Sequence, residues 1–161
     1  MRNLIIITVL VFVFFFIEYF LFNVVGTWAV PDLLLLLIIF FNFYLGIRYG
    51  IYAAVLAGLI KDSFMIGVFG IHLVSFVVCS YFIAFLQKYV YARGSTLSRF
   101  IVIFAACTLN ILLQFILQSA FVPVNFFEVF RYIYLPEVFL TLLISPYVFD
   151  KTKQCVLKFS V

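Results

Sequence analysis

Long apolar runs, separated by short groups of charged, glycine or proline residues, restrict the fold of this chain more than any other feature. Hydrophobic residues make up 68% of the 161 residues and charged residues only 10%, whereas ordinary soluble domains contain about 25% charged residues. A water-soluble domain of this size buries only part of its surface, so this chain would expose large apolar patches unless lipid surrounded it. The sequence therefore predicts an all-α integral membrane protein.

Six of the apolar runs approach or reach the length that a helix needs to cross a hydrocarbon core about 30 Å thick. One stretch, from Gly50 to Leu86, is too long for a single crossing, and Gly67 and Gly70 favour a turn inside it. The predicted helices of this single domain cover residues 4–22, 31–47, 50–65, 71–86, 97–121 and 132–149, and residues 150–161 form a short basic tail.

The distribution of Lys and Arg orients the predicted bundle. Cytoplasmic loops of membrane proteins carry an excess of these residues. With both ends of the chain in the cytoplasm, eight of the ten basic residues lie inside, and only Lys61 and Arg131 lie outside. Because the basic residues are spread singly, they form no patch for nucleic acid. The lipid bilayer is the expected surrounding.

Ionisable residues concentrate in the outer half of this oriented bundle. Ionisable residues within the membrane cost free energy unless they are paired, so we treat these residues as candidates for a functional site. For Asp32 the simpler interpretation is helix initiation, because proline at residue 31 and a carboxylate both suit the start of a helix. Glu18 either reaches the lipid headgroups or has a function. The outer polar group consists of Glu18, Asp32, Lys61, His72 and Glu137.

Small residues form a ridge at intervals of four that begins near the end of the predicted second helix, continues through the predicted third and ends in a carboxylate: Gly46, Gly50, Ala54, Gly58 and Asp62. Ridges of this kind let membrane helices approach closely. Two interpretations stay open, namely helix packing within the bundle and a docking seam for a helix of another protein. Both predict that Asp62 is shielded from lipid.

A polar stripe at intervals of four marks the predicted fifth helix, with Asn110, Gln114 and Gln118. Amide side chains in lipid seek hydrogen bonds between helices. We expect this face to look into the bundle or toward a partner, and a small outward-facing cavity is the less favoured alternative.

The chain lacks the residue patterns of metal sites and catalytic sites. Its three cysteines show no C-x-x-C spacing and have no neighbouring histidine. Cysteines without such patterns usually pack as small buried apolar side chains. His72 is the single histidine, and no nucleophile stands at a known spacing from it. The sequence therefore predicts no metal, no cofactor and no enzymatic activity.

The segment from Pro31 to Val78 resembles the MreD family of bacterial rod shape-determining membrane proteins. The matching features are Pro31 and Asp32 before an apolar helix, Gly46 and Gly50, the run from Gly58 to Asp62, and then Gly67 and Gly70. The resemblance implies a multi-pass scaffold in the bacterial cytoplasmic (inner) membrane that maintains cell shape within the elongation machinery, the elongasome, which builds sidewall peptidoglycan. The implied direct partner is MreC, bound in the membrane. MreB, RodA and a penicillin-binding transpeptidase are implied partners in a larger complex.

The family is also thought to share its fold with substrate-binding subunits of energy-coupling-factor vitamin transporters, and this is the alternative function. Those subunits carry an Ala-x-x-x-Ala docking motif in their first helix. The predicted first helix here, residues 4–22, contains no alanine and many phenylalanines. This difference favours the scaffold over the transporter.

Overall fold

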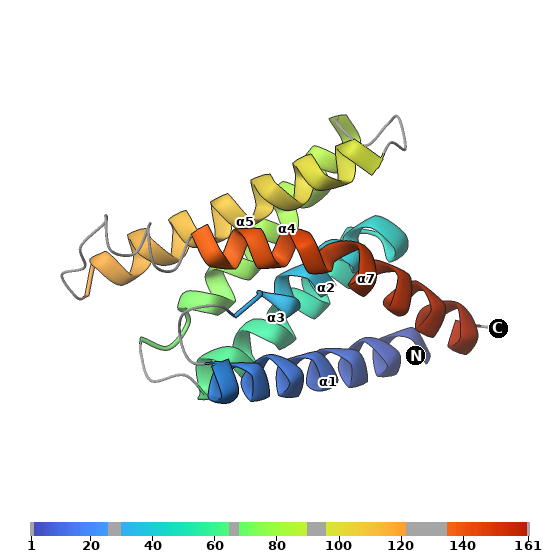
Figure 1. The fold of residues 1–161 in the computed structure, drawn as a ribbon, viewed down its shortest axis with the longest axis horizontal. Helices are drawn as coiled ribbons and strands as arrows, with labels where there is room; N and C mark the ends of the chain where they lie inside the picture. Colours follow the sequence, from blue (N-terminus) through green and yellow to red (C-terminus); the bar gives the residue numbers. More distant parts are fainter. Residues whose placement is uncertain (1, 26–29, 65–67, 90–95, 122–134, 161) are drawn as a thin grey trace.

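The computed structural model describes residues 2–25, 30–64, 68–89, 96–121 and 135–160. Within these ranges every regular element is a helix, so the predicted all-α class is confirmed (Figure 1). The helices are α1 (Arg2–Val25), α2 (Leu33–Leu45), α3 (Ile47–Phe64), α4 (Ile71–Tyr89), α5 (Thr96–Ser119) and α7 (Leu135–Ser160).

Three of the described helices are long and apolar enough to cross a membrane, namely Leu4–Val24 of α1, Ile71–Tyr89 of α4 and Ser98–Ser119 of α5. α2 is apolar but short, because its 13 residues rise only about 20 Å. α3 contains Arg48, Lys61 and Asp62, which lower its apolar character. The predicted count of six spans therefore stays a prediction.

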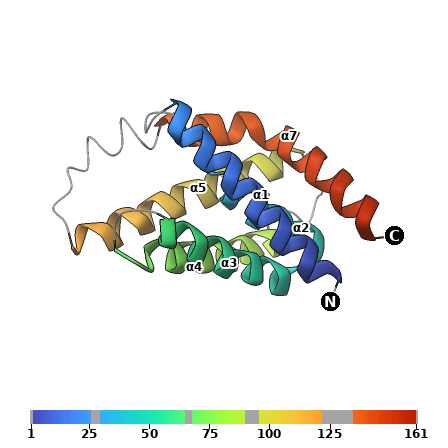
Figure 2. The ribbon, with the colours of Figure 1, turned by 90° about the horizontal axis from the view of Figure 1, so that it is seen from below.

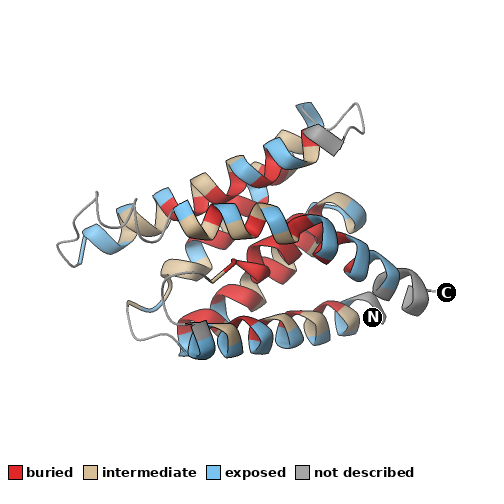
Figure 3. Ribbon diagram, in the orientation of Figure 1, coloured by how far each residue is buried: buried red, intermediate tan, exposed pale blue. Residues whose placement is uncertain are grey.

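α2 lies at the centre of the bundle and contacts α1, α3, α4, α5 and α7. Its residues from Leu33 to Asn42 are buried without interruption, so protein covers every side of this helix. Figure 3 shows the buried residues gathered on α2 and on the faces turned toward it. α1 and α7 lie along the outside of this core, and the view from below shows α1 crossing the bundle (Figure 2).

Gly46 separates α2 from α3. Its φ of +94° is a conformation that side chains rarely adopt, and its N–H donates to the carbonyl oxygen of Phe41 at 3.1 Å. Its own carbonyl oxygen accepts the N–H groups of Tyr49 and Gly50. α3 consequently begins earlier than the predicted residue 50. Gly46 is exposed, and a Cβ at this position would have no neighbour within 4 Å, so Gly46 makes the turn and does not pack in the ridge.

The structure assigns Pro31 and Asp32 other roles at the start of α2 than the sequence predicts. The sequence predicts that Pro31 lies inside the helix, but the helix begins at Leu33. Asp32 is the N-cap, with a side-chain oxygen accepting the N–H of Leu35 at 3.1 Å. An N-cap residue has a non-helical backbone, so the helix begins after Asp32 and Pro31 lies outside it.

α7 continues beyond the predicted end at residue 149 and reaches Ser160. No glycine or proline follows Pro146, so nothing breaks the helix, and the predicted basic tail is largely helical. The hydroxyl of Thr152 donates to the carbonyl oxygen of Val148 at 2.7 Å within this extension. The predicted start of this helix at residues 132–134, and Arg131, lie outside the described residues.

Candidate functional site

Lys61 of α3 lies at the centre of a buried ion cluster. Its Nζ is 2.7 Å from Oε1 of Glu18 in α1 and 3.5 Å from Oδ1 of Asp32. The ammonium also lies 5.5 Å from the ring centroid of Phe76 in α4. The second carboxylate oxygen of Glu18 accepts the N–H of Leu34 at 3.2 Å. A charge taken out of water is tolerated only with such partners.

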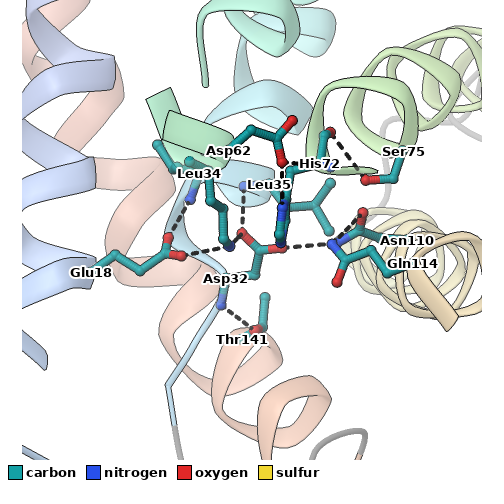
Figure 4. A network of polar contacts seen from close by, with 11 residues as sticks. Glu18, Asp32, Leu34, Leu35, Asp62, His72, Ser75, Asn110, Gln114 and Thr141 are labelled. Atoms are coloured by element: carbon teal, nitrogen blue, oxygen red, sulfur yellow. Dashed lines mark hydrogen bonds and ion pairs between the residues drawn. The ribbon is translucent and has the colours of Figure 1, made fainter. Parts of the chain in front are cut away.

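Asp32 links the start of α2 to two further helices. Besides capping its own helix, it accepts a hydrogen bond at Oδ2 from Nδ2 of Asn110 in α5, at 2.9 Å. Its backbone N–H donates to Oγ1 of Thr141 in α7 at 3.2 Å. Asp32 is only 3% exposed, and both Asn110 and Thr141 are fully buried. One aspartate therefore contacts groups from α3, α5 and α7 (Figure 4).

The polar stripe of α5 is split by the structure. Nε2 of Gln114 donates to Oδ1 of Asn110 at 3.2 Å, which extends the chain of hydrogen bonds that begins at Asp32. Gln118 is exposed at the end of α5 and is not part of this chain. Two of the three stripe residues thus belong to the buried site.

Asp62 makes a separate arrangement beside Lys61. Its carboxylate accepts the N–H groups of Gly70, His72 and Leu73 at 3.0 to 3.1 Å, and Nδ1 of His72 lies 2.8 Å from Oδ1. These N–H groups are the unsatisfied donors at the start of α4, so an aspartate of α3 caps a neighbouring helix. His72 and Asp62 point toward one another in Figure 4.

Glu137 lies in the first turn of α7 and is partly buried. It interacts electrostatically with Lys61, Asp32 and Glu18, so it belongs to the same cluster. All five residues of the predicted outer polar group are therefore brought to one region of the bundle. We call Glu18, Asp32, Lys61, Asp62, His72, Asn110, Gln114, Glu137 and Thr141 the polar network.

The ridge residues of α3 pack against helices of the same chain. A Cβ built on Gly58 would lie 2.5 Å from Cα of Leu73 in α4, and one built on Gly50 would overlap the amide of Asn42 in α2. Ala54 is also buried. These contacts favour the first interpretation of the ridge, helix packing within the bundle. Little of it remains open to a helix from another protein.

Asn42 and Thr141 are among the buried polar residues around the site that are not predicted from the sequence. Asn42 donates from Nδ2 to the carbonyl oxygen of Ile38 and to Oγ of Ser80 in α4, both at 3.0 Å. Thr141 supplies the contact from α7 to the start of α2. An isolated amide in a run of Leu, Ile and Phe indicates a contact between helices, because lipid offers it no hydrogen-bond partner. A lone threonine does not indicate such a contact, since its hydroxyl can bond to the backbone of its own helix.

In the described part of the chain, the polar network joins helices through ion pairs and hydrogen bonds. Among the described residues, the carboxylates contact Lys61, the imidazole of His72, backbone N–H groups or amide side chains. The nearby hydroxyl of Ser75 donates to the backbone carbonyl oxygen of His72 and not to its ring. In the part of the chain that the structure describes, no three His, Cys, Asp or Glu residues are placed to hold a metal ion. Cys79 and Cys107 are buried and unpaired as thiols.

Comparison with known proteins identifies the family. The family model for rod shape-determining protein MreD matches residues 1–150. No curated protein and no solved structure matches the chain significantly. The match includes every residue of the polar network and most of α7, so the predicted resemblance is confirmed over far more than its motifs. The chain belongs to the MreD family of rod shape-determining membrane proteins.

Proposed function

We propose that this protein is a non-enzymatic scaffold of the bacterial elongation machinery, which binds MreC in the membrane and so helps to position sidewall peptidoglycan synthesis. The observation that carries the proposal is the family match over residues 1–150, because the family acts in rod shape determination. The polar network supports a structural role, since its charged groups contact one another and the backbone of this chain.

We propose further that all six described helices cross the bacterial cytoplasmic membrane and that both ends of the chain lie inside. Eight of the ten basic residues then face the cytoplasm, as the positive-inside rule requires. The short α2 and the charged α3 are compatible with spanning. Protein covers α2 on every side, and Lys61 and Asp62 of α3 have partners inside the bundle.

The proposed partners follow from this placement. MreC would contact the bundle directly through its membrane helix, and MreB, RodA and a penicillin-binding transpeptidase would join in a larger complex. Because the ridge of α3 packs internally, we place the MreC contact on outward-facing helix surfaces and not on the ridge.

Affinity purification in a mild detergent tests the proposal. The tagged protein is expressed in a rod-shaped bacterium whose own copy is deleted, and the bound proteins are identified while cell shape is recorded. We expect MreC to copurify and rods to be restored. Restored rods without recovered MreC would contradict the direct contact. Thermal stabilisation by one member of a vitamin panel, without MreC, would favour the transporter alternative.

A further inference from the structure

A cavity between α5 and α7 lies far from the polar network. It is lined by Arg99 and Phe100 of α5 and by Pro146, Phe149 and Asp150 of α7, and its volume is about 180 Å³. Pockets for drug-sized ligands measure about 300–1,000 Å³, so this one suits a smaller group. Among the described residues, its lining combines the cationic side chain of Arg99, the carboxylate of Asp150 and aromatic walls.

Proline explains why the cavity exists. Pro146 lies inside α7 and has no N–H for the carbonyl oxygen of Leu142. The hydroxyl of Ser145, which also lines the cavity, donates to that oxygen at 2.8 Å in its place. α7 changes direction near its middle in both views (Figures 1 and 2). A proline in a helix causes such a bend, and here the bend lies where α7 passes α5.

With α5 and α7 crossing the membrane as proposed above, the cavity lies near one membrane surface. Asp150 lies roughly 20 Å along α7 from Glu137, and Arg99 lies roughly 17 Å along α5 from Asn110, at 1.5 Å per residue. The polar network therefore belongs to the other half of a hydrocarbon core about 30 Å thick. Beyond the cavity, Nζ of Lys151 lies 5.8 Å from the ring centroid of Tyr147. Basic and aromatic residues of this kind are typical of the interface with lipid headgroups.

We propose that this cavity binds the headgroup of a phospholipid that carries a primary ammonium, namely phosphatidylethanolamine. The guanidinium of Arg99 has the planar donor geometry that suits a phosphate diester. The carboxylate of Asp150 accepts the N–H groups of the ammonium. The rings of Phe100 and Phe149 cover the glycerol end of the acyl chains. A lining with one positive and one negative group complements a zwitterion better than it complements a lipid with net negative charge.

Native mass spectrometry of the purified protein tests this inference. The protein is first mixed, in detergent, with equal amounts of phosphatidylethanolamine, phosphatidylcholine and phosphatidylglycerol that have the same acyl chains. It is then released from the detergent, and the lipids that stay bound are identified by mass. We expect phosphatidylethanolamine to be retained roughly tenfold better than phosphatidylcholine, whose quaternary ammonium cannot donate a hydrogen bond to Asp150. Preferential retention of phosphatidylglycerol, equal retention of all three lipids, or no retention would overturn the proposal.

Two variants separate the roles of the charged residues. Asp150→Asn should reduce the preference for phosphatidylethanolamine over phosphatidylcholine toward one, whereas Arg99→Gln should weaken retention of both. Lys153→Gln is the control, because its Nζ lies over the ring of Tyr44, outside the cavity. An Asp150→Asn protein that keeps the wild-type preference would also overturn the proposal. Asp150 is exposed, so this variant remains informative even if Arg99→Gln fails to fold.

The inference depends on the proposed insertion of α5 and α7 in the membrane, but not on MreC. Selective lipid retention without copurified MreC would leave the lipid site standing and remove the proposed partner. Copurified MreC without lipid selectivity would do the reverse.

Discussion

α1 and α2 are both almost wholly apolar, yet they occupy opposite environments. α1 exposes large side chains such as Ile5, Phe16 and Phe20, each more than 60% exposed, whereas α2 is buried from Leu33 to Asn42. In a bilayer the lipid and the interior of the bundle are both apolar, so the hydrophobicity of a helix does not decide whether it faces lipid or lies inside the bundle. Both helices make polar contacts toward each end, but in α2 both contacting side chains, Asp32 and Asn42, are buried, whereas Thr8 of α1 is only partly buried.

The largest expected effect comes from removing the ammonium of Lys61 in α3, which lies beside Asp32 at the start of α2. Lys61→Met leaves the carboxylates of Glu18 and Asp32 buried without their ion pairs, which should destabilise the fold by about 3–5 kcal/mol. The thermal midpoint of the purified protein in detergent measures this. The double variant Lys61→Met/Glu18→Gln should recover part of the loss. Equal midpoints for wild type and Lys61→Met would show that the cluster does not hold α1 and α2 together.

A pair of truncations compares the two helices directly. Leu36→Ala in α2 removes a fully buried side chain and should cost about 2–5 kcal/mol through the cavity it leaves. Phe16→Ala in α1 is the matched control, because Phe16 is 62% exposed and its loss should change stability by about 0.5 kcal/mol or less. Thermal midpoints measured in the same detergent decide the comparison. Similar losses at both sites would mean that α1 is buried against a partner.

A small residue between α2 and α3 should show a moderate effect. Gly50→Ala places a methyl group against the amide of Asn42 and should cost about 1–3 kcal/mol through overpacking. Combining it with Asn42→Ala should cost less than the sum of the two single changes, because the two residues share one contact. Additive losses in the same melting assay would contradict this packing.

The smallest expected effect concerns the polar contact between α1 and α3. Oγ1 of Thr8 lies 3.2 Å from the hydroxyl of Tyr52. Thr8→Val keeps the shape of the side chain and should cost only about 0.6 kcal/mol, the average for hydrogen bonds between membrane helices. Tyr52→Phe is the reciprocal variant and should cost a similar amount. A loss comparable to that of Lys61→Met would show that α1 is held by this contact as much as by the ion cluster.

The all-helical class and the grouping of ionisable residues could be predicted from the sequence, because hydropathy and the cost of buried charge are local properties. The partners of each charged residue could not. Glu18 meets Lys61 across 43 positions of the chain, and Asp32 meets Asn110 across 78, so both contacts depend on how the helices pack. The sequence order of the residues contains no direct record of that packing.

The contacts of Asp62 show a second limit of prediction from the sequence. Both interpretations of the ridge predict that Asp62 is shielded from lipid, and it is buried, but its role as the cap of α4 depends on the turn at Gly70. Likewise, the glycines of the ridge indicated close helix approach without indicating the partner. The structure supplies Leu73 and Asn42 as the contacts, and both belong to this chain.

The most direct test of the central claim is cell shape in a deletion strain that carries Lys61→Met or Lys61→Met/Glu18→Gln. Protein level in the membrane and the thermal midpoint are measured in parallel. If the polar network holds a scaffold together, rod shape should follow stability, so the double variant should restore more rods than the single one. Round cells at wild-type protein level and with a wild-type thermal midpoint would contradict the account, because Lys61 would then act on something other than the fold.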